Sequence, residues 1–306
     1  MSIAAPRRTA VPTAFAVAAG AGLAAQAYIN GRLGRSLGSA ELAATINNVT
    51  GLSVLAVIMV VTGAAPRALR RRADVRPWHL LGGLGGAMLV AAGAIAAPEI
   101  GVALLSLALV CGQTSGSLVA DRVGLSPAGR RDITPARMGG VALAVAAVTL
   151  SALGAHTSPQ AGLIAFAVVA GVANALQQAA NGHLARVTGE PVFAMTVNFL
   201  VGAAALAAVA AVVTGLSPPH GWSAPVPEYL AGVIGAAVAT TMVVTVSRLG
   251  VLRLMLGVIA GQAAGGLVVD LVAPIHGETV TAATVVGVAL TFLAVLVTGR
   301  DRHVAR

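Results

Sequence analysis

The sequence predicts an all-α integral membrane protein in which ten transmembrane helices form two inverted five-helix repeats. Three observations predict this fold class: the composition, the number of apolar stretches and an internal repeat. Of 306 residues, 57% are hydrophobic and only 9% are charged, and the mean hydropathy is +0.89. A soluble domain carries about 25% charged residues. So few charges cannot cover a water-facing surface, which excludes a soluble protein.

Ten apolar stretches follow one another along the chain, separated by Arg, Pro or polar clusters. Each is close to the roughly 20 residues that a helix needs to cross a bilayer. The segments between them are short, so no soluble domain is expected. The predicted spans are 13–33, 40–62, 78–97, 101–120, 137–154, 162–184, 191–214, 228–247, 251–270 and 280–299.

The distribution of positive charge predicts the orientation. All 19 basic residues are Arg, and with the N-terminus inside, 17 of them fall in cytoplasmic segments while only Arg32 and Arg35 fall outside. The positive-inside rule therefore predicts cytoplasmic termini and an even number of spans. The net charge of +9 reflects topology, so nucleic acid is not an expected partner.

An internal repeat divides the chain into 13–154 and 162–299. Eight positions recur 151 residues later: Gln26, Asn30, Gly31, Leu33, Arg35, Gly38, Asn47 and Gly51 match Gln177, Asn181, Gly182, Leu184, Arg186, Gly189, Asn198 and Gly202. Nine more recur at an offset of 149: Gly83, Gly86, Gly101, Val102, Gly112, Gln113, Gly116, Leu118 and Asp121 match Gly232, Gly235, Gly250, Val251, Gly261, Gln262, Gly265, Leu267 and Asp270.

Each repeat contains five predicted helices, and this odd number has a consequence. The second copy must enter the membrane from the opposite side, which relates the halves by a pseudo-twofold axis in the membrane plane, a design typical of transporters. The first span follows Arg7 and Arg8 and resembles a cleavable signal peptide. The repeat indicates whether this segment is cleaved or retained. Because 162–184 repeats its length and its Gln and Asn, we expect it to be retained.

The chain resembles the ten-helix drug/metabolite transporter superfamily, and within it the YdcZ-type inner-membrane exporters. The resemblance rests on the five-plus-five topology, the stretch Asn30-Gly31-Arg32-Leu33-Gly34, and the Gly112-Gln113 to Asp121 pattern that closes the fourth span. It covers nearly the whole chain. It implies a multi-pass permease of a bacterial-type inner membrane, acting as an exporter, with a cavity between the halves. It implies no particular substrate.

Polar side chains near the middle of a span are costly in lipid and are therefore candidates for function. Gln113 and Gln262 are predicted within roughly 4 Å of the midplane, and Gln26 and Gln177 lie near mid-depth in their spans. These four amides could surround one polar solute near the pseudo-twofold axis. The alternative for Gln113 and Gln262 is that they only bond neighbouring helices.

Asn30 and Asn181 share a helix face with Gln26 and Gln177, respectively. They are candidates for substrate binding, and the alternative is that they bond loop backbone at the helix ends. Asn47 and Asn198, in the following helices, are interpreted instead as polar groups that serve helix packing.

Asp121 and Asp270 end the fourth and ninth predicted spans, on opposite faces of the membrane. One interpretation makes them solvated carboxylates at the membrane boundary. The other gives them a role as gates or in a proton relay.

The expected function is secondary transport of a small polar or amphipathic metabolite by alternating access. Export, proton coupling and facilitated transport all remain open, as does a homodimer, and the expected partners are a small-molecule substrate and the lipid bilayer. The sequence offers no cofactor or metal motif and no nucleophile with a base partner, so an enzyme is not expected. The alternative function is a non-transport membrane scaffold or a channel-like protein.

Overall fold

The computed structural model describes residues 7–71, 75–125, 129–130, 132–153, 160–273 and 280–299, and within these ranges it contains helices and no β-strand. Seven helical segments are long and apolar enough to cross a membrane. They belong to α1 (Arg7–Leu37), α2 (Ala40–Thr62), α4 and α5 (Pro77–Leu80 and Gly82–Val123), α6 (Pro135–Leu153), α7 (Gln160–Thr188), α8 (Pro191–Thr214) and α9 (Ala231–Val272). The predicted all-helical membrane class is confirmed.

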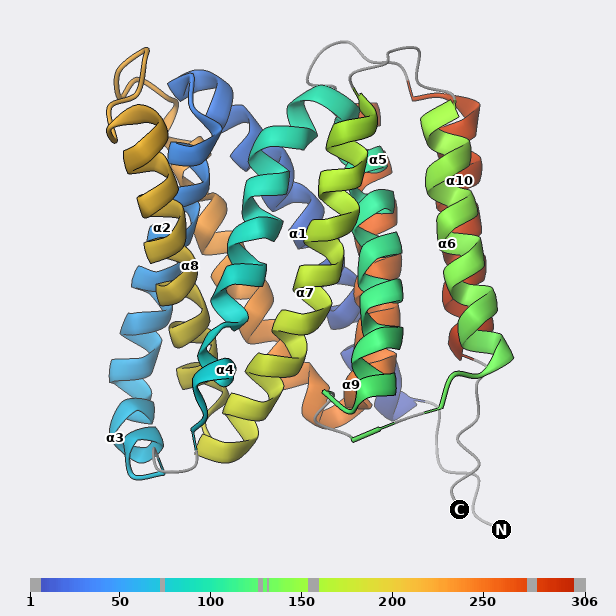
Figure 1. The fold of residues 1–306 in the computed structure, drawn as a ribbon, viewed down its shortest axis with the longest axis horizontal. Helices are drawn as coiled ribbons and strands as arrows, with labels where there is room; N and C mark the ends of the chain where they lie inside the picture. Colours follow the sequence, from blue (N-terminus) through green and yellow to red (C-terminus); the bar gives the residue numbers. More distant parts are fainter. Residues whose placement is uncertain are drawn as a thin grey trace.

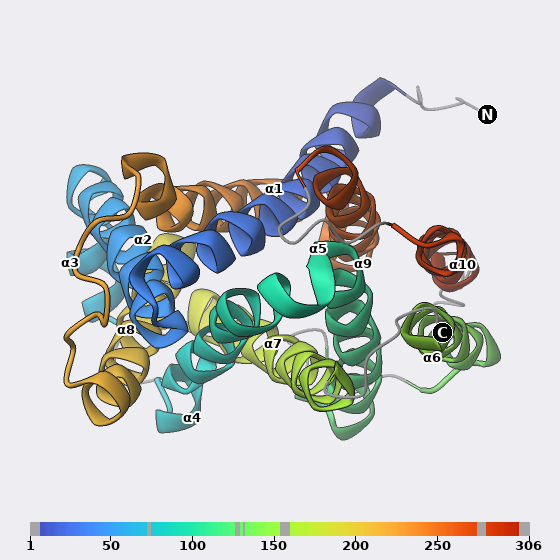
Figure 2. The ribbon, with the colours of Figure 1, turned by 90° about the horizontal axis from the view of Figure 1, so that it is seen from above.

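Three further elements complete the described chain. They are the short helix α3 (Ala64–Leu69), the 3₁₀ turn η2 (Val226–Leu230) and the apolar helix α10 (Ala282–Gly299). Figure 1 shows that the first described turn of α1 and the last turn of α10 lie at the same end of the bundle. Figure 2 shows α6 and α10 side by side at one edge of the molecule.

The predicted spans 78–97 and 101–120 are not separated by a loop, because α5 contains residues 82–97 of the first span and all of the second. α5 is broken at Gly101, whose φ of 77° and ψ of 159° are not helical. Only glycine adopts this conformation without strain, and Pro98 in the preceding turn adds a residue without an N–H. In Figure 1, α5 runs to one end of the bundle, bends and returns.

Likewise, one helix, α9, contains residues 231–247 of the predicted span 228–247 and all of the span 251–270. Figure 1 shows α9 bending at the end of the bundle opposite the bend of α5. Figure 2 shows the same change of direction from above. The two long helices therefore act as two helical hairpins with opposite directions.

Equivalent residues end α1 and α7. Gly38 and Gly189 have φ values of 66° and 72°, the left-handed conformation that stops a helix at low cost. The next helices then begin at once. The Ser39 hydroxyl accepts a hydrogen bond from the N–H of Leu42 at 3.1 Å and caps α2, and Pro191 occupies the first turn of α8.

Close helix crossings at glycine repeat in the two halves. α5 packs on α7, and α1 packs on α9. A Cβ added to Gly112 would lie 2.0 Å from the Val168 carbonyl oxygen, and one added to Gly261 would lie 1.9 Å from that of Val17. These helices contact through their backbones, as small residues permit in membranes.

Gly171→Ala is expected to destabilise the protein, because its Cβ would lie 2.2 Å from the Leu109 carbonyl oxygen. Overpacking of this kind costs about 1–3 kcal/mol. Thermal unfolding in detergent measures the effect. Gly162→Ala on the same helix is the matched control, because its Cβ would have no neighbour within 4 Å. Equal unfolding temperatures for the two variants would contradict the predicted contact.

An ion pair outside the spans joins α3 to the α7–α8 turn. Arg67 donates to both carboxylate oxygens of Glu190, and this bonding lowers the pKa of Glu190 below its ordinary value. The pair therefore stabilises the fold at neutral pH, and that contribution is lost as the pH falls through the lowered pKa.

Arg67→Gln is expected to raise the pKa of Glu190 toward its ordinary value. The part of the acid-induced loss of stability that comes from this pair should then disappear, and the change is small because Arg67 is exposed. Unfolding temperatures of the parent and the variant across an acid series measure this difference. Superimposable pH profiles would show that the pair does not form in solution.

Candidate functional site

The structure places two of the predicted amides in equivalent hydrogen bonds. Gln26 Nε2 donates to Asn47 Oδ1 at 3.0 Å, and Gln177 Nε2 donates to Asn198 Oδ1 at 2.9 Å. Each bond joins the first helix of a repeat to its second helix. Among the described hydrogen bonds, none joins one of the four glutamines to another.

The two predicted asparagines near the helix ends differ from each other. Asn30 Nδ2 donates to the Val90 carbonyl of α5 at 3.1 Å, and Asn181 Nδ2 donates to Asn198 Oδ1 at 3.1 Å. Both side chains are buried. Their partners lie on neighbouring helices, which differs from the loop backbone that one interpretation of the sequence offered them.

Gln113 and Gln262 are the most deeply buried glutamines, each 2% exposed. Neither amide atom of Gln113 has a hydrogen-bond partner, and Oε1 of Gln262 has none. The tight crossings at Gly112 and Gly261 hold these side chains at the contacts of α5 with α7 and of α9 with α1. An unpaired buried polar group costs about 1–3 kcal/mol, which makes these amides candidates to bond a ligand or water.

Asn174 on α7 joins this group, although the sequence analysis did not single it out. It is 4% exposed, and its Oδ1 has no partner. It lies three residues before Gln177, so the two side chains share a helix face. The repeat obscured it because Leu23 occupies the equivalent position. An Asn in the apolar part of the stretch 162–184, before Gln177, was the available signal.

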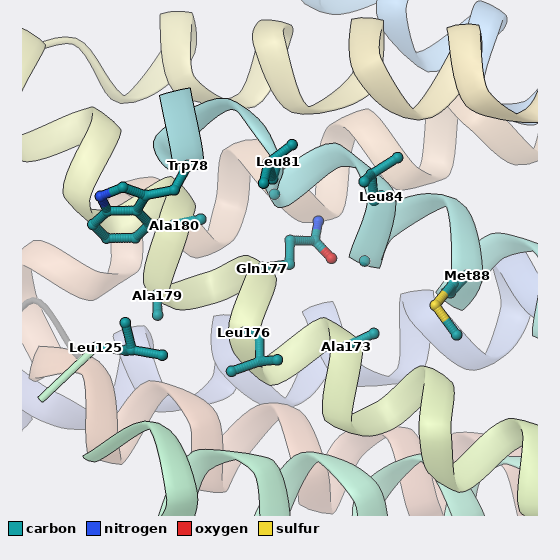
Figure 3. A pocket seen from close by; sticks show the side chains of 12 residues that line it. Trp78, Leu81, Leu84, Met88, Leu125, Ala173, Leu176, Gln177, Ala179 and Ala180 are labelled. Carbon is teal, nitrogen blue, oxygen red and sulfur yellow. The ribbon is translucent and has the colours of Figure 1, made fainter. Parts of the chain in front are cut away.

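A groove of about 480 Å³ lies between α4–α5 and α7. Figure 3 shows the Gln177 amide near its middle, between Trp78 at one end and Met88 at the other. The lining is otherwise mostly aliphatic. The volume is within the range of pockets that hold drug-sized molecules.

The break in α5 leaves backbone groups without helical partners, and side chains of two other helices bond three of these groups. In an unbroken helix, the N–H of Val102 would donate to the Pro98 carbonyl. Asp270 of α9 instead accepts from the N–H of Val102 at 2.9 Å and of Ala103 at 2.7 Å. Arg35 of α1 donates to the Pro98 carbonyl at 2.8 Å. These five residues, here called the α5 clasp, join α1, α5 and α9.

Asp121 is the repeat equivalent of Asp270, but its carboxylate is bound differently. It forms an ion pair with Arg137 of α6, and both side chains are largely buried. Asp270 thus bonds the backbone of a broken helix while Asp121 bonds a side chain. Within the described ranges, no group of three His, Cys, Asp or Glu side chains could hold a metal ion.

Apolar helices of bilayer length with buried, unpaired amides between them define a multi-pass membrane protein with internal polar sites. The family described as "Putative inner membrane exporter, YdcZ" matches residues 11–150 and 162–297. The chain belongs to this YdcZ family, which confirms the predicted resemblance. Membership indicates membrane transport rather than catalysis and an inner-membrane location.

Comparison with solved structures adds support for the fold alone. A structure described only as "Crystal structure of protein" aligns with a TM-score of 0.54 over 96% of both chains, at 20% sequence identity. No curated protein matches the sequence.

Proposed function

We propose that the protein is a secondary transporter, working as an exporter, that moves a small polar or amphipathic metabolite by alternating access. The observation that carries the proposal is the pair of buried glutamines with unpaired amide atoms, Gln113 and Gln262, at equivalent places in two halves. A solute held between the halves would supply the missing hydrogen bonds.

The architecture that we propose has ten crossings in two inverted halves with cytoplasmic termini. Three observations support it. The bonds Gln26–Asn47 and Gln177–Asn198 are repeat equivalents. The bends of α5 and α9 lie at opposite ends (Figure 1). The family match falls in two segments, one in each half.

The proposed binding residues are six amides: Gln26, Gln113, Gln177, Gln262, Asn30 and Asn181. An amide both donates and accepts hydrogen bonds, which suits a carbonyl, amide or hydroxyl group better than a bare charge. The amides are also neutral, so their burial in the membrane interior requires no side chain of opposite charge. A neutral or zwitterionic solute therefore fits this set best.

The α5 clasp supports a gate on the outer face. While Asp270 and Arg35 hold both sides of the break, α1, α5 and α9 cannot separate there. Asp121, paired with Arg137, is the corresponding group at the inner face. In this proposal the clasp must open once in each transport cycle.

Reconstitution tests the proposal. Proteoliposomes are loaded with a panel of neutral and zwitterionic metabolites, and efflux is measured with and without a pH gradient. We expect protein-dependent efflux of at least one polar solute, and dependence on the gradient would show proton coupling. Efflux equal to that of empty liposomes across the panel, from protein that is folded and inserted, would count against transport and favour a scaffold.

A further inference from the structure

The α5–α7 groove has a shape that follows from small residues. Gly85 of α5 faces α7, where a Cβ would lie 2.4 Å from the Ala173 carbonyl oxygen. Ala179 and Ala180 continue the α7 wall. The small side chains leave a space of about 480 Å³ between the larger Trp78 and Met88.

The rim of the groove is apolar and exposed. Leu81, Leu84 and Leu176 are 57%, 45% and 40% exposed, and all three line the groove. Leucines that are exposed on membrane-spanning helices contact lipid chains. If these helices cross the bilayer as assigned, the groove opens sideways toward lipid, and a ligand can enter it from the membrane.

One hydrogen-bond acceptor without a partner lies inside this apolar groove. Gln177 is 9% exposed, and its Nε2 is already bonded to Asn198. Its Oε1 is buried without a partner, and Figure 3 places the amide inside the groove. The lining residues include no charged side chain. The groove therefore offers an unpaired hydrogen-bond acceptor, Gln177 Oε1, in apolar surroundings.

The contact of α9 with α1 offers a natural comparison. At the repeat equivalents of Gly85, Ala179 and Ala180, the sequence has Ile234, Tyr28 and Ile29. The larger side chains occupy the corresponding positions around Gln26. The groove is therefore particular to the contact of α4–α5 with α7.

We infer that the α5–α7 groove binds, from the bilayer, an apolar molecule that carries one O–H or N–H group, and that this group donates to Gln177 Oε1. The aliphatic part of the molecule lies against Leu84, Met88 and Leu176. The inference rests on the proposed function only in taking the bound molecule to be cargo, and binding itself is independent of transport.

Fluorescence tests this binding. Trp222→Phe leaves Trp78, at the end of the groove, as the single tryptophan. The full-length protein in liposomes is titrated with 6-bromohexan-1-ol and, separately, with its methyl ether, which cannot donate. Bromine quenches tryptophan on contact. We expect saturable quenching. The concentration that gives half-maximal quenching should be about threefold to tenfold lower for the alcohol than for the ether, because the net contribution of one hydrogen bond corresponds to this range.

Two variants test whether a hydrogen bond to Gln177 causes this difference. Each compound partitions into the lipid to the same extent in every sample, so partitioning does not contribute to a difference between proteins. Gln177→Leu should abolish the difference between alcohol and ether, while Thr114→Val, at a residue outside the groove whose hydroxyl bonds its own helix, should preserve it. The inference is overturned if alcohol and ether quench the parent protein alike, or if their difference survives in Gln177→Leu. Intact quenching by a protein that fails every efflux assay would overturn the transport proposal and leave the groove standing.

Discussion

Replacing Gln113 or Gln262 by Leu is expected to reduce transport at least tenfold without lowering the stability of the protein. Both side chains are 2% exposed, and their unpaired amide atoms contribute no hydrogen bond to the stability of the folded protein. Leu is at home in the membrane interior, and removing an unsatisfied buried group is neutral or stabilising. A solute that bonds these amides in transit would lose at least one hydrogen bond.

Efflux from proteoliposomes and thermal unfolding must be measured on the same preparations. The alternative, in which the two glutamines only bond neighbouring helices, predicts the opposite pair of results: stability falls and transport survives. Thr114→Val provides a control one residue away, because its hydroxyl is already bonded to the Val110 carbonyl of its own helix. Retained efflux in both glutamine variants would remove them from the binding site.

Replacing Asp270 by Asn is expected to open the outer face of the protein. The substitution removes the negative charge of Asp270 and one of the two carboxylate oxygens that accept from the N–H groups of Val102 and Ala103. These two residues begin the part of α5 that follows Gly101. Bonds from backbone N–H groups to a carboxylate contribute about 1.5–3 kcal/mol, and 1.4 kcal/mol corresponds to a tenfold change in an equilibrium. The open form should therefore become at least about tenfold more populated.

Alkylation of a single cysteine reports this opening. Ala97 precedes the clasp and is 0% exposed, so Ala97→Cys in a Cys111→Ser background should react with a membrane-impermeant maleimide only when the clasp opens. Asp270→Asn should accelerate the reaction about tenfold. Asp121→Asn is the comparison, because Asp121 bonds Arg137 at the inner face and not the backbone at the break in α5, and it should not accelerate the reaction. Equal rates in all three proteins would show that the clasp is not a gate.

Composition and periodicity were enough to predict the helical membrane fold, because both follow from the bilayer. The spans 78–97 and 101–120 were placed correctly on either side of the break in α5. The clasp itself was not predictable. It depends on Asp270 and Arg35 reaching backbone groups far away in sequence, and the sequence assigned Arg35 only to an outer loop.

The polar site was predictable in part. Depth and repetition singled out the glutamines, since both are properties of the sequence. Partners are properties of packing, so the sequence could not tell that Gln26 and Gln177 have bonded Nε2 groups while Gln113 has unpaired amide atoms. Asn174 and the groove were missed because both break the repeat on which the search relied.

The opposite orientation of the two halves is the central claim, and side-specific labelling tests it most directly. Arg70→Cys lies directly after α3, in the connection from α2 to α4, and Ser223→Cys lies in the corresponding connection after α8. Both native residues are exposed. In a Cys111→Ser background, an impermeant maleimide should label Ser223→Cys in intact cells and Arg70→Cys only in inverted vesicles. Labelling of both cysteines from the same side would place the two halves in the same orientation and contradict the account.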